Sequence, residues 1–229
     1  RHGAKLIWEV HDLWPLSPIE LGGMSRWHPF ILWMQHAENA ACRDADVVVS
    51  MLPKAYIHLR QHGMDANKFV YVPNGIDPTE WISVNADPLP VAHALAIQTA
   101  REQGHLLVAY AGAHGIANAL DSMLDAAALT RNEPITWLLV GTGPEKQRLQ
   151  RRVKTEGLNR VTLLDSVPKA TIPALLRSMD VLYIGLQNES LFRFGISPNK
   201  LMDYMMAERP VLCAIAAGND PVGDANCGF

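Results

Sequence analysis

The sequence is poor in cysteine, has no excess of one charge, and contains no apolar run long enough to cross a bilayer. Its 229 residues include three widely spaced cysteines, Cys42, Cys213 and Cys227. An odd number at such spacing predicts neither a disulfide framework nor a paired zinc-ligand motif, and indicates reduced thiols in the cytoplasm. Because 20 basic and 23 acidic residues leave a net charge of −3, we expect no nucleic-acid partner. Without an apolar run of about 18 residues, any membrane contact is expected to be peripheral.

What the chain does have is apolar residues, which make up 48% of it. This share supports a large core, divided over one large domain or two small ones. The chain opens on Arg1 instead of a methionine, and it closes on Asn226-Cys227-Gly228-Phe229 without a predicted terminal helix. We therefore expect both ends to be cuts inside a longer protein.

Strand-length apolar runs alternate with helix-length amphipathic stretches along most of the chain. The strand runs are largely continuous, as in parallel strands that are buried on both faces, so the order predicts a parallel α/β fold. The expected strands are Lys5–Val10, Asp46–Ser50, Lys68–Pro73, Leu106–Ala111, Thr136–Val140, Val161–Leu164, Val181–Ile184 and Pro210–Ala214. The expected helices cover about 28–42, 52–62, 117–130, 144–156, 170–178 and 198–208.

The alternation is interrupted once, between Asp77 and Gln103, where a Pro-rich stretch is followed by a helical pattern over Val91–Arg101. We interpret this as the connection between two doubly wound sheets. The predicted organisation is a first domain over residues 1–82, a linker over 83–104 and a second domain over 105–229. Since the first sheet would have only three strands, an upstream part of that domain is expected to lie outside the chain.

Two polar residues follow the first predicted strand. His11 and Asp12 stand at its carboxyl end, where open α/β sheets bind their ligands. The alternative is that Asp12 caps the next turn and His11 only covers the strand end.

The stretch Phe192–Ala207 carries the strongest signal for a ligand. Ser197 is a good N-cap and Pro198 a good first helical residue, so a helix is expected to begin here. Lys200 would then oppose the positive end of the helix dipole, unless a phosphate bound by the free N–H groups offsets its charge. Asp203 could accept hydrogen bonds from sugar hydroxyls or pair with Lys200; Lys200 could instead extend into water.

Other motifs are weaker. Asp44-Ala45-Asp46 resembles an acidic metal-binding triplet, but turn capping explains it, and no metal is expected. Gly141-Thr142-Gly143 lacks the remainder of a dinucleotide fingerprint, and the basic residues of 146–154 are expected to form a solvated face. One helix carries a cluster of large apolar residues that either packs into the core or meets a lipid surface: Trp27, Phe30, Trp33 and Met34.

Together these motifs resemble the group 1 retaining glycosyltransferases, in the branch that builds bacterial O-antigen and capsule polysaccharides. The resemblance is carried by His11-Asp12, Val72–Asp77, Leu138–Glu145 and, above all, Phe194–Ala207 followed by Arg209-Pro210-Val211. It implies the GT-B fold, which consists of two Rossmann-like domains, here with an incomplete first domain. It also implies a nucleotide-sugar donor, no cofactor and no metal.

The resemblance assigns roles to particular residues. His11 would reach the transferred sugar, Lys200 would stabilise the leaving diphosphate, and Asp203 would hold the ribose. The loop containing Val167 and Lys169 would meet the base. The remaining donor-binding residues would be Gly112, Gly195, Ile196, Ser197, Pro198 and Asn199.

The sequence departs from the family pattern at two places. Gly195 stands where the first Glu of the family's Glu-x7-Glu motif is expected. The segment that begins at Gly112 lacks the Arg and Lys that many members use for the phosphates. Lys200 is therefore expected to carry the leaving-group charge, with Arg193, Arg209 or Asp12 as helpers.

The predicted function is transfer of a sugar, with retention, from a nucleoside diphosphate sugar to a lipid-linked saccharide. The donor is expected to be a UDP-amino sugar. The protein is expected to lie in the cytoplasm or at the inner face of the plasma membrane. Two alternatives stay open: a sugar-nucleotide 2-epimerase and a non-catalytic nucleotide-binding module.

Overall fold

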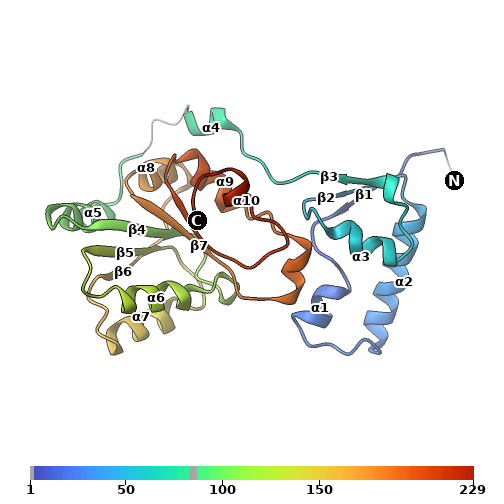
Figure 1. The fold of residues 1–229 in the computed structure, drawn as a ribbon, viewed down its shortest axis with the longest axis horizontal. Helices are drawn as coiled ribbons and strands as arrows, with labels where there is room; N and C mark the ends of the chain where they lie inside the picture. Colours follow the sequence, from blue (N-terminus) through green and yellow to red (C-terminus); the bar gives the residue numbers. More distant parts are fainter. Residues whose placement is uncertain (1–2, 83–86) are drawn as a thin grey trace. The chain divides into compact units, whose positions relative to one another are not determined.

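The computed structural model describes residues 3–82 and 87–229, which form two compact units (Figure 1). The first unit contains Arg1–Asn74, Asn188–Pro198 and Ala216–Asp220. The second contains Gly75–Gln187, Asn199–Ile215 and Pro221–Phe229. Each unit has its own parallel sheet and is described separately.

The first unit is built on a three-stranded parallel sheet in the order β1-β2-β3, formed by Ile7–Val10, Val47–Ser50 and Phe69–Tyr71. Its helices are α1 (Leu16–Glu20), α2 (Pro29–Asp44) and α3 (Ala55–Gln61), with a short 3-10 turn η1 (Ala66–Lys68) before β3. A second 3-10 segment, η4 (Ser190–Phe194), comes from far along the chain and adds Leu191 and Phe194 to the core around Val48.

The second unit has a five-stranded parallel sheet in the order β6-β5-β4-β7-β8. The strands are β4 (Leu106–Ala111), β5 (Ile135–Val140), β6 (Val161–Leu164), β7 (Val181–Gly185) and β8 (Val211–Ala214). The order reverses between β4 and β7. In open α/β sheets the crevice beyond the strand ends at such a reversal is where ligands bind.

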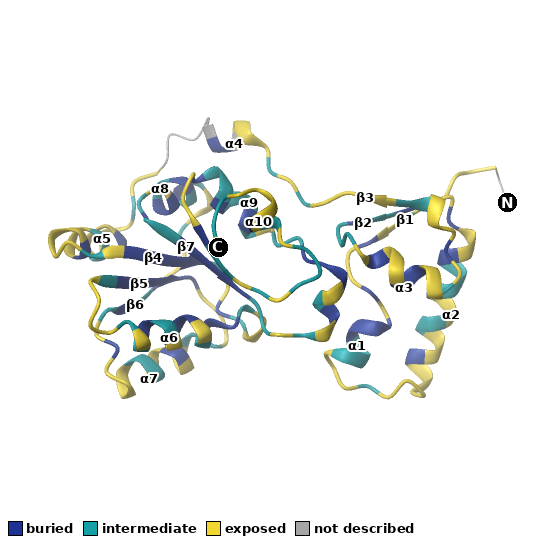
Figure 2. Cartoon of the chain, viewed as in Figure 1, coloured by how far each residue is buried: buried dark blue, intermediate teal, exposed yellow. Residues whose placement is uncertain are grey.

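Helices cover both faces of this sheet, which explains why its strands read as continuous apolar runs (Figure 2). On one face lie α6 (Leu120–Leu129) and α7 (Lys146–Thr155), preceded by η2 (Ile116–Asn118). The other face is covered by α5 (Val91–Glu102), α8 (Ile172–Arg177), which follows η3 (Lys169–Thr171), and α9 (Asn199–Met206). The short helices α4 (Pro78–Ile82) and α10 (Pro221–Asp224) complete the unit.

The secondary structure agrees with the sequence analysis for all eight strands and seven helices, with ends displaced by a few residues. Three short helices were missed, namely α1, α4 and α10. Each is only four or five residues long, so no helical period can develop in the sequence. The expectation of no helix near the carboxyl end is therefore wrong, because α10 forms one helical turn there.

The predicted domain boundaries differ from the observed units. The linker predicted over 83–104 contains α5, whose Ala100 is buried in the core of the second unit, so this helix belongs to that domain. Arg101 also binds Asp180 through two hydrogen bonds of 2.8 Å each. The part of the linker at 83–86 lies outside the described residues. Residues 188–198, predicted for the second domain, pack in the first unit through Leu191 and Phe194.

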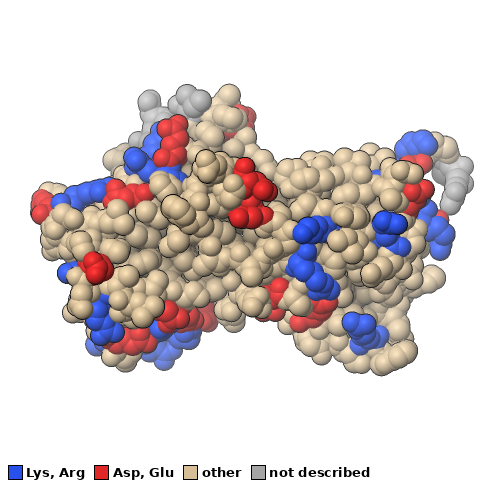
Figure 3. Space-filling model, viewed as in Figure 1, with Lys and Arg blue, Asp and Glu red and all other residues tan. Residues whose placement is uncertain are grey.

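The basic residues of α7 are more constrained than the predicted solvated face. Arg148 and Arg152 form ion pairs with acidic residues of α6, including Asp121. On the face drawn in Figure 3, Lys and Arg lie next to Asp and Glu at the lower left, where Figure 1 places α6 and α7. The ion pairs join the two helices across the surface.

The aromatic cluster of the first unit is largely exposed. Trp27 is 83% exposed, Trp33 66% and Phe30 41%. The interpretation that the cluster packs in the core is thus wrong for these three side chains within the described part of the chain, whereas Met34 is half-buried. Across residues 3–82 and 87–229, no helix has the length and hydropathy needed to cross a bilayer.

Candidate donor-binding site

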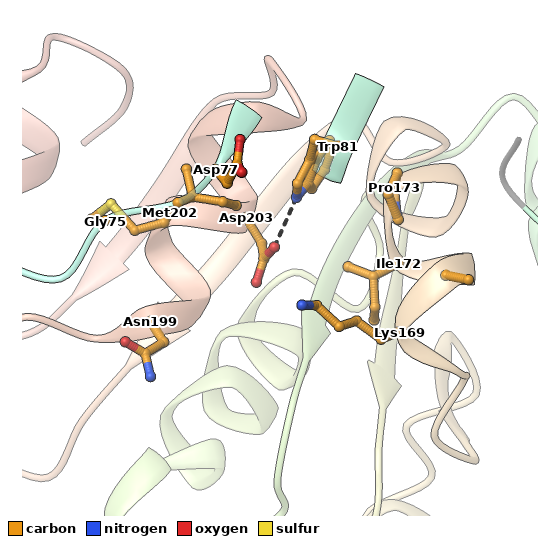
Figure 4. Close-up of a pocket in the computed structure, with 11 residues that line it drawn as sticks. Gly75, Asp77, Trp81, Lys169, Ile172, Pro173, Asn199, Met202 and Asp203 are labelled. Carbon is orange, nitrogen blue, oxygen red and sulfur yellow. Dashed lines mark hydrogen bonds between the residues drawn. The ribbon is translucent and has the colours of Figure 1, made fainter. Parts of the chain in front are cut away.

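The second unit contains a cleft of about 820 Å³ beside the amino end of α9 (Figure 4). Part of its wall follows β6, where Lys169 begins η3 and Ile172 begins α8. Asn199 and Asp203 of α9 form another part, and Trp81 closes one end. Of the residues predicted to bind the donor, the structure brings Lys169, Asn199 and Asp203 together here.

Asp203 is fixed in the cleft by an aromatic side chain. Its Oδ1 accepts a hydrogen bond of 2.9 Å from the indole Nε1–H of Trp81. Figure 4 shows the carboxylate directed into the cleft, on the same side as the Lys169 side chain. The predicted alternative of an Asp203–Lys200 pair is therefore wrong. Within residues 3–82 and 87–229, the second carboxylate oxygen of Asp203 is left to accept hydrogen bonds from a ligand.

Lys200 points toward the carboxyl end of β4. Its Nζ donates to the hydroxyl of Tyr110 at 2.8 Å and to Oδ1 of Asn118 at 2.7 Å, and it lies 4.5 Å from the centre of the Tyr110 ring. A Cβ added at Gly112 would be 3.3 Å from the same Nζ. Lys200 is thus not extended into water, as one interpretation of the sequence allowed, but lies at the reversal point of the sheet.

The positive charge of Lys200 is stabilised there by uncharged groups alone, among the described residues. Burial lowers its pKa from 10.5 to about 8, because both hydrogen-bond partners are uncharged. An ammonium group has three hydrogens, and these two contacts use two of them. The third can serve an anion.

A smaller recess of about 270 Å³ lies at the carboxyl ends of β4 and β5. Gly112 and Val167, both predicted to bind the donor, line it with Gly141 and Ile172. Ile172 also lines the larger cleft, so the two hollows are adjacent within the second unit.

The Gly-x-Gly motif has a packing role. A Cβ at Gly141 would lie 1.9 Å from the carbonyl oxygen of Gly112, and one at Gly143 would lie 2.4 Å from that of His114. The two loops are joined by a 2.8 Å hydrogen bond from His114 N–H to the Thr142 carbonyl. The glycines therefore allow the loops that follow β4 and β5 to touch. This packing role explains the two glycines without a dinucleotide-binding motif.

His114 belongs to the loop that follows β4, and the sequence analysis assigned it no role. Its side chain is fully buried, and neither ring nitrogen has a hydrogen-bond partner in the described part of the chain. Burial, assisted by Lys146 and Lys200, lowers the pKa of the imidazole to about 4, so the ring is neutral at pH 7. No periodic pattern distinguishes a loop histidine of this kind, so the sequence offered no signal for it.

Residues 195–198 belong to the first unit, and their polar groups are largely used there. A Cβ at Gly195 would lie 2.5 Å from Pro53, and the Ile196 N–H donates to Asn219 at 2.8 Å. Ser197 accepts a hydrogen bond of 2.9 Å at its hydroxyl from the Asn74 N–H. The helix begins at Asn199, so Ser197 does not cap it as expected. The polar groups of residues 195–197 that were predicted to bind phosphate are in part bonded to other protein atoms.

Two of the predicted helpers have other partners. Arg193 binds both carboxylate oxygens of Glu20 at 2.7 Å, which lowers the pKa of Glu20 to about 2. Arg209 donates to the carbonyl oxygen of Arg177 at 2.8 and 3.2 Å. Both guanidinium groups hold protein atoms in the structure, and a phosphate-binding role for either stays a prediction.

His11 directly follows β1, as predicted, and its side chain is exposed. Its Nε2 lies 3.3 Å from a carboxylate oxygen of Glu9. Asp12 is exposed as well. Their roles toward a sugar stay predictions.

Comparison with known proteins identifies the family of the second domain. A family model described as glycosyl transferases group 1 matches residues 105–229, which is more than half of the chain. The chain belongs to the group 1 glycosyltransferases. The matched region contains Lys200, Asp203 and the part of the cleft wall from Lys169 onward, and it supports the group 1 family named from the sequence.

Individual relatives of this glycosyltransferase chain are distant. The colanic acid biosynthesis glycosyl transferase WcaI of Escherichia coli K12 is 27% identical over 132 residues, which cover 57% of this chain and 30% of that protein. The glycosyltransferase WbjE of Pseudomonas aeruginosa is 21% identical over 216 residues, which cover 94% of this chain and 52% of that protein. The chain thus spans between about a third and a half of these relatives.

Solved structures confirm the fold. WaaG, a glycosyltransferase involved in lipopolysaccharide biosynthesis, superposes with a TM-score of 0.67 at 16% identity, covering 97% of this chain and 60% of that one. Anabaena Alr3699/HepE, solved with UDP and glucose, gives a TM-score of 0.62 at 21% identity, covering 93% and 54%. The predicted α/β architecture with two doubly wound parallel sheets, of GT-B type, is therefore confirmed.

Proposed function

We propose that the protein transfers a sugar from a nucleoside diphosphate sugar, with retention at the anomeric carbon, in the synthesis of a bacterial surface polysaccharide. Family membership supports the transferase class, and the UDP in the HepE structure supports UDP as the nucleotide. WcaI and WaaG, by their names, act in colanic acid and lipopolysaccharide synthesis, which supports the pathway class.

The observation that carries the proposal is the placement of Lys200. An ammonium group with a third hydrogen to donate lies at the reversal point of the sheet, beside the small recess. A diphosphate placed there would be stabilised as its negative charge grows during departure, an electrostatic effect that is often the largest in catalysis. Tyr110 and Asn118 hold the ammonium group in place, so little reorganisation is needed.

The larger cleft is proposed to hold the nucleoside. The remaining oxygen of Asp203 would accept the ribose hydroxyls, while Trp81 keeps the carboxylate in position. The base would lie near Val167 and Lys169, which follow β6. Transfer then requires no metal at this site, since Lys200 supplies the positive charge, and the departing diphosphate would accept the proton of the acceptor hydroxyl.

The acceptor is proposed to be a lipid-linked saccharide at the inner face of the plasma membrane. The exposed Trp27 and Trp33 support this, because exposed tryptophans favour a lipid–water interface. Sedimentation with anionic liposomes tests the idea. Binding should fall in a Trp27→Ala, Trp33→Ala double variant, and unchanged binding would contradict a membrane role for these residues.

Donor binding tests the main proposal on the intact protein. Calorimetry with a panel of UDP-sugars should find a ligand for the wild type, and Asp203→Asn should weaken it at least tenfold because a charged acceptor is lost. Trp81→Phe should weaken it less, by about fivefold, since only the orientation of the carboxylate suffers. Asp224→Asn, at an exposed position, is the matched control.

The reaction outcome is tested by following donor and product. Transfer with retention predicts one product with the anomeric configuration of the donor. Failure to bind any nucleotide sugar would contradict the proposal as a whole, and an inverted product would contradict retention. Conversion of UDP-N-acetylglucosamine without an acceptor would favour the epimerase.

A further inference from the structure

A second polar cluster lies in the first unit, between α2 and α3. Glu38 and His58 are buried, and the Glu38 Oε1 lies 2.8 Å from the His58 Nε2. The side-chain amide of Gln35 places its Nε2 position 2.6 Å from the Glu38 Oε2, 2.9 Å from the Asn39 Oδ1 and 2.8 Å from the His62 Nδ1. Nothing in the sequence analysis or in the proposed reaction uses these residues.

Three of these atoms form a closed triangle in which one of the three contacts cannot be a hydrogen bond. The amide position of Gln35, the Asn39 Oδ1 and the His62 Nδ1 lie 2.8, 2.9 and 3.0 Å from one another. An amide nitrogen only donates, an amide oxygen only accepts, and each imidazole nitrogen does one or the other. Since a ring of three cannot alternate between donors and acceptors, one edge always joins two of a kind, whichever amide orientation or tautomer is chosen.

A cation removes this conflict. If Gln35 turns its oxygen inward and the His62 Nδ1 is unprotonated, all three atoms are acceptors that lie within 3.0 Å of one another. Two ligands at right angles and about 2.1 Å from an octahedral ion lie about 3.0 Å apart, close to the three edges of the triangle. The Glu38 Oε2 is 2.6 Å from the Gln35 position and 3.9 Å from the His62 Nδ1, so it is close enough to both to be a fourth ligand of the same ion.

We propose that Gln35, Glu38, Asn39 and His62 bind a divalent first-row transition-metal ion that fastens α3 to α2. His58 acts as a positioning residue, since it holds the second oxygen of the Glu38 carboxylate. One imidazole nitrogen among three oxygens favours Mn²⁺ and its neighbours over Ca²⁺, whose ligands are oxygens at longer distances. Water reaches the cluster through His62, whose side chain is 25% exposed. The expectation of no metal was drawn from Asp44-Ala45-Asp46 and, for the transfer reaction, from the family resemblance, and this cluster involves neither the triplet nor the proposed donor site.

Calorimetry of the intact, tag-free protein with MnCl2, and separately with ZnCl2, tests the proposal. We expect one ion per chain, with Zn²⁺ bound more tightly than Mn²⁺. His62→Ala and Glu38→Gln should each weaken Mn²⁺ binding at least tenfold. His36→Ala is the matched control, because His36 is an exposed histidine on the same helix.

The melting temperature separates loss of a ligand from loss of the fold. Excess MnCl2 should raise the melting temperature of the wild type and of His36→Ala, but not of His62→Ala. Gln35→Leu, at a half-buried position, is a second ligand variant in case His62→Ala or Glu38→Gln fails to fold. Absence of stoichiometric binding by the wild type, or equal affinity in folded ligand variants and the control, would overturn the proposal.

Discussion

The lowered pKa of Lys200 predicts that donor binding takes up a proton. In the structure the ammonium group loses hydration, and its partners among the described residues are the uncharged Tyr110 and Asn118, so its pKa falls from 10.5 to about 8. A bound diphosphate would supply the missing negative charge and bring the pKa back toward its usual value. The lysine then binds a proton as the donor binds.

The size of the effect follows from the two pKa values. At pH 8.5 a group with a pKa of about 8 is about one quarter protonated, whereas a group with a pKa of about 10.5 is almost fully protonated, so uptake is about 0.75 proton. At pH 7 the free lysine is already about nine-tenths protonated, and the uptake falls to about 0.1 proton. Proton uptake should therefore increase steeply with pH.

The uptake is measured by calorimetry of UDP-N-acetylglucosamine binding, or of whichever UDP-sugar binds, in two buffers that differ in their enthalpy of ionisation. Lys200→Met should abolish the uptake and weaken binding. Lys154→Met, at an exposed position of α7, should leave both unchanged. An uptake at pH 8.5 that is equal in the wild type and in Lys200→Met would refute the assignment of Lys200 to the diphosphate.

The same pKa shift has a consequence for stability without ligand. Because the folded state disfavours the charged lysine, the unfolded chain binds more protons between pH 8 and 10.5, and stability should rise with pH across that window. The full difference is about 3 kcal/mol. Urea unfolding of Lys200→Met should lack this rise.

Two further predictions concern packing and an ion pair. Gly141→Ala places a Cβ against the Gly112 carbonyl and should destabilise the protein by about 3 kcal/mol or more in urea unfolding, whereas Gly157→Ala, with a φ of +64° and open space around it, should cost about 1 kcal/mol; similar losses would contradict the close contact of the two loops. Arg193→Met should leave donor affinity unchanged and lower stability by no more than about 1 kcal/mol, since the Arg193 side chain of the pair is 48% exposed and its charge is screened by water. Because the pKa of Glu20 is lowered from 4.5 to about 2, the pair's contribution should be present above pH 4.5 and disappear as pH falls toward 2, and a wild-type pH profile identical to that of Arg193→Met would contradict it.

The architecture could be predicted because it depends on local patterns. Continuous runs such as Leu106–Ala111 are buried on both faces wherever they lie in the sheet, and the alternation of strand and helix restricts the topology to a few parallel arrangements. The extent of α5 was also correct, but its assignment to a linker was wrong. That assignment depended on what Ala100 packs against, which the pattern of the helix does not contain.

The site was predictable only in part. Asp203 was named from its position in a motif, yet its partner Trp81 stands 122 residues away and lies in a stretch expected to belong to the first domain. Lys200 was placed at a helix start, but Tyr110 and Asn118, which determine its pKa, come from β4 and the segment after it. Arg193 and Arg209 were named because their positive charge suits a phosphate, but in the structure they bind Glu20 and the Arg177 carbonyl.

The chain's residue order therefore determined the elements, the parallel α/β class and the family resemblance, because hydrophobic periodicity and turn chemistry act over a few neighbouring residues. Only the tertiary structure decided which charges are compensated. Whether a lysine faces a hydroxyl, a carboxylate or a future phosphate depends on residues that the fold brings together from distant segments, and the surrounding burial then determines its protonation and what it can bind.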